Sequence, residues 1–128
     1  MKRLALIADL HGNAVALDAV LDDLACRRII ELVCLGDVAA GGPQPREALA
    51  RLRELGCPVV FGNADAWLLD GLPREGEHEA QGEGDRLAAI VKWARAQLTP
   101  VDESFVRSFA PIIERELAGH RWALATMK

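Results

Sequence analysis

The chain has 128 residues, of which 51% are hydrophobic and 27% are charged. This is the size and composition of one small globular domain, so wholesale disorder is excluded and no second domain is expected. Lysines and arginines number 15 against 19 aspartates and glutamates, which leaves a net charge of -4. That balance excludes the basic footprint typical of nucleic-acid-binding and membrane-binding proteins. It still allows phosphate chemistry where a metal ion supplies the positive charge.

The cysteines and the N-terminal residues bear on where the protein works. Cys26, Cys34 and Cys57 lie in apolar or helical surroundings without a C-x-x-C spacing. This predicts buried, reduced thiols rather than disulfides or a zinc site. The apolar run near the N-terminus ends at Asp9, so it is too short for a signal peptide or a membrane span. We therefore expect a cytoplasmic protein with no membrane partner.

The first half of the chain alternates short apolar runs with amphipathic segments. Residues 3–8, 29–35 and 57–62 are apolar without a helical period, which predicts three buried strands. The segments 14–28 and 46–55 between them carry apolar residues at helical spacing. Strand, loop and helix repeated in this order predict β-α-β units and a mainly parallel sheet.

Local signals predict where several helices begin and end. The side chain of Asn13 can cap the first helix, and Gly56 is a natural helix-ending residue for the second. Thr99 and Pro100 are a cap and a first-turn residue for a later helix.

The second half of the chain combines helical patterns with one hairpin. The predicted elements are helices over 66–72, 85–98 and 100–109, then a β-hairpin of 112–117 and 121–126 with Ala118-Gly119-His120 at its turn. Between the first two helices, residues 73–85 are rich in glycine and glutamate and have almost nothing to bury. We expect this segment to be a solvated, mobile loop.

Polar clusters follow each of the three predicted strands. Asp9 and His11 follow the first, Asp37 the second, and Asn63 and Asp65 the third. The carboxyl ends of parallel strands meet at one rim, where open α/β sheets bind ligands. Taken singly, each residue is more simply a turn or strand-end residue. Together, carboxylates, an imidazole and an amide suit a divalent ion, and the centrally placed Asp37 could bridge two of them.

Three sequence segments resemble the first three motifs of the calcineurin-like metallophosphoesterases: IADLHGN, CLGDVAAGGPQP and VVFGNAD. The resemblance is closest to small bacterial members and continues through Trp67 into the hairpin. It implies an α/β fold in which a β-sandwich of two sheets is flanked by helices. Because the chain stops directly after its last predicted strand, we expect residues 1–128 to form a single, incomplete domain. That domain would be the N-terminal part of the four-layer α-β-β-α fold.

The resemblance also implies a role for each motif residue. Asp9 and His11 would bind the first of two metal ions, and Asp37 would bridge both. Asn63 would bind the second ion and touch the phosphate, which makes it the catalytic candidate. The implied ions are manganese, iron, zinc or nickel. The implied reaction is hydrolysis of phosphomonoesters or phosphodiesters by a metal-bound water, and the partners are phosphate-ester small molecules or nucleotides.

The chain departs from the family pattern in two places. Ala64 stands where the third motif usually has a histidine that protonates the leaving group or stabilises phosphoryl oxygens. The later histidine motifs of the family have no match, since His78 lies in the glutamate-rich segment and His120 in the predicted hairpin turn. We therefore expect weakened metal binding, mainly at the second site. We also expect an exposed edge of the second sheet through which copies could associate.

Two other classes of function compete with hydrolysis. A catalytically inactive scaffold or binding module of the same fold, as in the retromer sorting complex, is favoured by Ala64 and opposed by the intact motif residues. An unrelated α/β phosphatase would need a D-x-D motif after the first strand, where this chain has Asp9-Leu10-His11. A receiver-type domain would need an acidic pair near the first strand and a lysine at a later strand end, and the sequence has neither.

Overall fold

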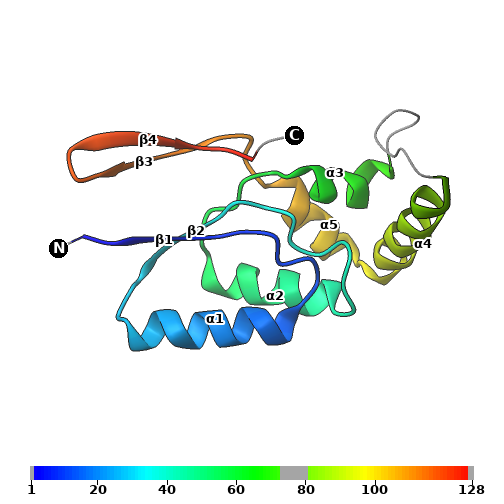
Figure 1. The fold of residues 1–128 in the computed structure, drawn as a ribbon, viewed down its shortest axis with the longest axis horizontal. Coiled ribbons are helices and arrows are strands. Elements are labelled where there is room, and N and C mark those ends of the chain that lie inside the picture. Colours follow the sequence, from blue (N-terminus) through cyan, green and yellow to red (C-terminus); the bar gives the residue numbers. More distant parts are fainter. Residues whose placement is uncertain (1, 73–80, 127–128) are drawn as a thin grey trace.

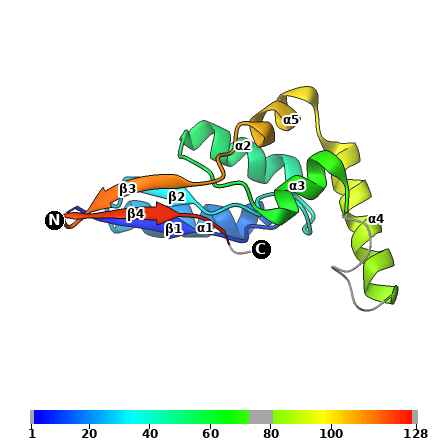
Figure 2. The same cartoon turned by 90° about the horizontal axis from the view of Figure 1, so that it is seen from above.

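A computed structural model describes residues 2–72 and 81–126, except for the side chains of residues 81–85. The strands are β1 (Leu4–Ile7), β2 (Glu31–Cys34), β3 (Ile113–Leu117) and β4 (His120–Leu124). The helices are α1 (Ala14–Cys26), α2 (Pro45–Leu55), α3 (Asn63–Asp70), α4 (Gln81–Gln97) and α5 (Pro100–Arg107). In Figure 1, α1 and α2 lie on one side of β1 and β2, and the β3–β4 hairpin lies on the other. Figure 2 shows α4 projecting at the end of the molecule opposite the hairpin tip.

The central sheet is parallel, as predicted, but shorter than expected. β1 pairs with β2 from Leu4 opposite Glu31 to Ile7 opposite Cys34. The predicted third strand over 57–62 is wrong in extent, because only single parallel bridges form there, from Val59 to Cys34 and from Val60 to Ala110. Pro58 has no backbone N–H to donate, and α3 begins soon after the two valines, so there is no room for a longer ladder.

Two apolar clusters cover the two faces of this sheet. The larger one joins the sheet to the helices and buries Leu17 of α1, Leu49 and Leu52 of α2, and Leu68 of α3. The smaller one packs Val33 and Val60 against Ile113 of β3 and so attaches the hairpin. Val33 and Cys34 of β2 are fully buried, which explains why this strand is apolar without alternation. The prediction that the first strand is also buried is wrong, because β1 is only half-buried and Leu6 is 48% exposed.

The helix-end signals in the sequence are confirmed. Asn13 accepts a hydrogen bond from the Ala16 amide at 2.9 Å. Gly56 ends α2 in the left-handed conformation with a φ of 68°. Thr99 caps α5, with Pro100 in its first turn.

Three predicted helix boundaries are wrong. α3 spans Asn63–Asp70 rather than 66–72. α4 begins at Gln81, inside the predicted loop 73–85, and residues 73–80 of that loop lie outside the described residues. α5 ends at Arg107 rather than near Phe109, because the chain turns there to reach the bridge at Ala110.

The hairpin is present, with a tighter turn than predicted. Leu117 pairs directly with His120, so the loop is Ala118-Gly119 and His120 is the first residue of β4. Both loop residues have positive φ, 54° and 79°, which is the backbone of a type I′ turn.

The three cysteines are free, as expected, but the prediction that all are buried is wrong. Cys34 is buried and Cys57 is half-buried, whereas Cys26 is exposed in the last turn of α1. Burial raises the pKa of the Cys34 thiol to about 12, which keeps it protonated. No helix in the described part of the chain is long and apolar enough to span a membrane.

Asp102 links two helices through one buried carboxylate, and its removal tests this packing. It accepts from the Thr99 amide at 2.9 Å, and Arg46 and Arg53 of α2 approach its oxygens at 3.3 and 3.6 Å. We expect Asp102→Ala to lower the free energy of unfolding by about 2 kcal/mol, since the bond from the Thr99 amide and both ion pairs are lost. The exposed neighbour provides the control: Glu103→Ala should cost at most about 0.5 kcal/mol in the same urea titration. Equal losses would contradict this assignment.

Candidate metal centre

The loops that follow β1 and β2 run side by side and are joined through their backbones. Four backbone hydrogen bonds connect them. The amides of Asp9, His11 and Gly12 donate to the carbonyl oxygens of Gly36, Asp37 and Val38, with N···O distances of 3.2, 2.9 and 2.8 Å. In the opposite direction, the Gln44 amide donates to the Gly12 carbonyl oxygen at 2.8 Å. This pairing brings the polar residues of the two loops to the same rim of the sheet.

The paired loops gather three of the predicted site residues. Ligand atoms of Asp9, His11 and Asp37 all lie within 4.8 Å of one another. The Nε2 atom of His11 is 3.7 Å from a carboxylate oxygen of Asp9. Two carboxylates and an imidazole provide the oxygen and nitrogen donors that bind divalent metal ions. The donor set therefore fits a divalent cation.

The orientation of His11 leaves one ring nitrogen free for a metal. Its Nδ1 atom lies 2.8 Å from the carbonyl oxygen of Ala40. Because a carbonyl oxygen only accepts, Nδ1 carries the hydrogen in the neutral ring and Nε2 keeps its lone pair. Nε2, the nitrogen that faces Asp9, therefore carries the lone pair. The contact with the Ala40 carbonyl holds the ring in this tautomer, in which Nε2 can bind a metal.

Asp9, His11 and Asp37 also share an uncommon backbone conformation. Their φ angles are 57°, 44° and 56°, in the left-handed region that side chains other than glycine rarely adopt. Such conformations persist where surrounding contacts enforce them, and they concentrate at functional sites. Here the paired loops provide those contacts. Gly42 allows their close approach, because a Cβ atom at that position would lie 2.0 Å from the His11 carbonyl oxygen.

Asp65 holds the loop after β2 against the start of α3. Its carboxylate is fully buried and accepts from the backbone amides of Asp37, Val38 and Gly62, each at 2.9 Å. Burial raises the pKa of Asp65, and the three amide donors act in the opposite direction. From the sequence, Asp65 is predicted only as a member of the polar cluster after the third strand. The signal that identifies it is its place three residues after Gly62 at a helix start, the position of a capping-box acid.

The side chain of Asp37, in the loop after β2, contacts the N-terminus of α3. Its Oδ1 atom accepts from the Ala64 amide at 2.9 Å. Burial raises the pKa of Asp37, the Ala64 amide lowers it, and the neighbouring Asp9 carboxyl raises it again. A cation bound between Asp9 and Asp37 would favour the charged form of both carboxyls.

The other residues that the sequence singled out lie outside the group of Asp9, His11 and Asp37. Asn63 is the exposed first residue of α3, next to the Ala64 amide that binds Asp37, so its role as a ligand stays a prediction. The Ala64 side chain is buried in the larger apolar cluster. His120 begins β4 on the hairpin, and His78 lies outside the described residues.

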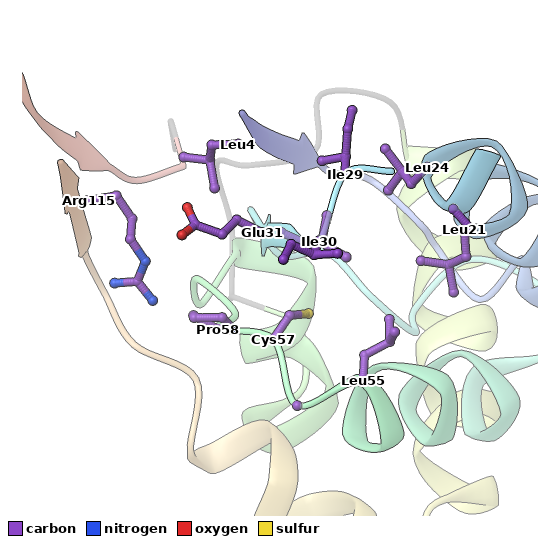
Figure 3. Close-up of a pocket in the computed structure, with 13 residues that line it drawn as sticks. Leu4, Leu21, Leu24, Ile29, Ile30, Glu31, Leu55, Cys57, Pro58 and Arg115 are labelled. Atoms are coloured by element: carbon purple, nitrogen blue, oxygen red, sulfur yellow. The ribbon is translucent and has the colours of Figure 1, made fainter. Parts of the chain in front are cut away.

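A separate cavity lies at the opposite ends of the same strands. It has a volume of about 560 Å³ and is lined by the starts of β1 and β2, the ends of α1 and α2, and Arg115 of β3 (Figure 3). Most of its lining is aliphatic, as Leu21, Leu24 and Leu55 show. None of the predicted site residues lines it. Ligands of open α/β sheets bind at the carboxyl ends of the strands, which is where Asp9 and Asp37 lie.

Comparison with known proteins identifies the family. Residues 2–113 match the family model described as calcineurin-like phosphoesterase. The chain belongs to this family. The uncharacterized protein MJ0912 of Methanocaldococcus jannaschii is 31% identical over 118 residues, which cover 92% of this chain and 46% of MJ0912.

Two solved structures share the fold. A metallophosphoesterase from Sphaerobacter thermophilus superposes with a TM-score of 0.67 and 29% identity, over 88% of this chain and 43% of that one. The hypothetical protein PH1004 from Pyrococcus horikoshii OT3 superposes with a TM-score of 0.81 and 21% identity, over 96% of this chain and 54% of that one. The chain therefore spans about half the length of the relatives it matches.

The family resemblance and the fold class predicted from the sequence are thereby confirmed. Metallophosphoesterases generally bind divalent metal ions, and Asp9, His11 and Asp37 are the group that offers such ligands in the described part of this chain.

Removing the Asp65 carboxylate should destabilise the metal centre and the fold together. We expect Asp65→Ala to lower the free energy of unfolding by about 3 kcal/mol, because the backbone amides of Asp37, Val38 and Gly62 lose their hydrogen-bond acceptor in a buried site. Asp70→Ala, at the exposed end of the same helix, should cost at most about 0.5 kcal/mol. Urea unfolding measures both variants, and calorimetry should show weaker Mn²⁺ binding for Asp65→Ala alone. An Asp65→Ala protein as stable as the control would contradict the bracing role of this carboxylate.

Proposed function

We propose that this chain is a metal-dependent phosphoesterase domain that hydrolyses phosphomonoesters or phosphodiesters, nucleotides included. The observation that carries the proposal is the convergence of Asp9, His11 and Asp37, with the His11 ring held in the metal-binding tautomer. Membership of the calcineurin-like phosphoesterase family supports it. The free cysteines support a cytoplasmic location as part of the same proposal.

The proposed centre holds two divalent ions. Asp9 and His11 would bind the first, Asp37 would bridge both, and Asn63 would bind the second. Manganese, iron, zinc and nickel all suit this mixture of oxygen and nitrogen donors. When bound, such ions would supply positive charge to the phosphoryl oxygens and lower the pKa of a coordinated water.

The chain's own groups position the reactants. The Asp37 carboxylate is aimed by the Ala64 amide at the start of α3, so it does not depend on a metal for its orientation. The Ala40 carbonyl does the same for His11. The side-chain amide of Asn63 would donate to a phosphoryl oxygen from the exposed first turn of α3. No histidine at position 64 protonates the leaving group, so we expect esters with good leaving groups to react fastest.

An inactive scaffold of the same fold is the second candidate, and Ala64 is the observation that favours it. Its side chain packs in the apolar core, so this position offers the reaction no titratable group. A scaffold would keep the fold and could keep metal binding, but it would have no turnover.

A titration with Mn²⁺ distinguishes the two candidates. We expect calorimetry to detect binding and the same sample to hydrolyse bis-p-nitrophenyl phosphate, whose good leaving group tolerates the absent histidine. Asp37→Asn should lower turnover by at least about 100-fold, because one carboxylate serves both ions. Asn63→Ala should lower turnover but keep the first binding event. Asp22→Asn, an exposed carboxylate on α1, is the matched control and should behave as the wild type.

Each alternative outcome of this titration has a distinct meaning. Binding without turnover would favour the scaffold. A folded sample with neither binding nor turnover would refute the metal-dependent reaction for this chain.

Self-association through the hairpin is a further part of the proposal. β4 pairs with β3 on one side, and in the described structure its other edge has no strand partner. Four of its five residues are exposed, including Trp122 at 50%. An exposed apolar edge of this kind favours pairing with a second copy. We expect concentration-dependent dimers in sedimentation velocity, and Trp122→Lys should shift the protein to monomer while Val101→Lys, an exposed site on α5, should not. A wild-type protein that stays monomeric at high concentration would refute this interface.

A further inference from the structure

A groove adjoins the metal centre on the side of α4. It has a volume of about 360 Å³ and is lined by the loop residues 41–43 and, from α4, by Ala89, Ile90 and Trp93. The loop residues follow directly on Ala40, whose carbonyl oxygen holds the His11 ring. A Cβ atom at Gly41 would lie 3.5 Å from Nδ1 of His11. The loop side of the groove therefore lies beside the Nδ1 atom of His11.

α4 presents an apolar face to this groove rather than burying it. Val91 and Ala94 of the helix are buried in the core, whereas Ile90 and Trp93 are 41% and 46% exposed. Ala89 and Ile90 lie four and three residues before Trp93, so the three form one face of the helix. Figures 1 and 2 show α4 at the end of the molecule where the loop between β2 and α2 turns. The exposed face and the metal centre therefore lie at the same end of the fold.

The chemistry of the lining selects the kind of group that would fit. None of the residues that line the groove is charged, so the groove offers nothing to a charged or strongly polar substituent. Trp93 and Pro43 provide flat apolar surfaces of the kind against which aromatic rings stack. For this groove to act as a subsite, the organic substituent of a phosphate ester held at Asp9, His11 and Asp37 has to extend past the His11 ring toward residues 41–43.

We propose that the groove between residues 41–43 and α4 is the binding subsite for an aromatic substituent of the phosphate ester, with Trp93 as the residue that determines this specificity. The inference rests on the proposed phosphoesterase function and names its substrate class. Trp93 contributes to binding and not to the chemical step.

The test uses two ligands that the enzyme cannot hydrolyse, phenylphosphonate and methylphosphonate, each titrated by calorimetry in the presence of Mn²⁺. Wild type should bind the phenyl compound about 3- to 10-fold more tightly than the methyl compound, which is the range expected for one aromatic contact. Trp93→Ala should abolish this preference without weakening methylphosphonate binding, and Trp93→Phe should retain it. Ala89→Phe, which fills the groove, should also abolish the preference.

Val101→Ala is the control, because it removes an exposed apolar side chain from α5. It should keep the preference for the phenyl compound, and circular dichroism should show that every variant is folded. Equal binding of both phosphonates to wild type, with binding still dependent on Mn²⁺, would overturn the subsite and leave the proposed function intact. If neither phosphonate binds in the presence of Mn²⁺, the subsite and the proposed function both fail. Retained preference in Trp93→Ala would overturn the role of Trp93.

Discussion

The buried carboxylate of Asp65 is the contact on which the geometry of the metal centre depends. It accepts from the backbone amides of Asp37 and Val38, which lie 28 and 27 residues away in the sequence. The carbonyl groups of the same two residues accept from the amides of His11 and Gly12. One short stretch of backbone therefore joins α3 on one side to the loop after β1 on the other. In a low-dielectric interior these bonds are costly to break, so all three segments hold a common position.

This bracing explains how the site tolerates a strained backbone. Asp9, His11 and Asp37 each adopt a left-handed conformation, which costs roughly 1–2 kcal/mol per residue. One residue in this conformation is common at a turn, but three candidate ligands that share it require the surrounding bonds to offset the strain. Gly42 contributes by leaving space, since any side chain there would collide with the His11 carbonyl. The rigid part of the molecule is thus the part that presents the ligands, as a preorganised centre requires.

The sequence predicted the features that depend on residues close together in the chain and missed those that depend on long-range contacts. Asn13 and Thr99 identify their helix starts because a cap acts within three residues, and the order of strands and helices predicted the parallel sheet. The extent of the third strand was missed, because the pairing of Val60 with Ala110 joins distant parts of the chain. The bracing role of Asp65 was missed because its bonds to Asp37 and Val38 are long-range, and only its bond to Gly62 has a local signal. The positions after successive strands did predict that Asp9, His11 and Asp37 would meet, whereas their function as ligands, and that of Asn63, remains a prediction.

Under the proposed phosphoesterase function, two features of the chain favour the same kind of substrate. Ala64 provides no acid for the leaving group, which disfavours esters of aliphatic alcohols, because an alkoxide leaves poorly without a proton. A phenol has a pKa of about 10, so its anion leaves without that help far more readily. The groove beside His11 is apolar and contains Trp93, so it favours an aromatic substituent. In a nucleoside monophosphate the leaving group is a sugar hydroxyl, even though the base is aromatic. An aryl phosphate ester therefore suits both the absence of an acid and the apolar groove, whereas a nucleoside monophosphate suits only the groove.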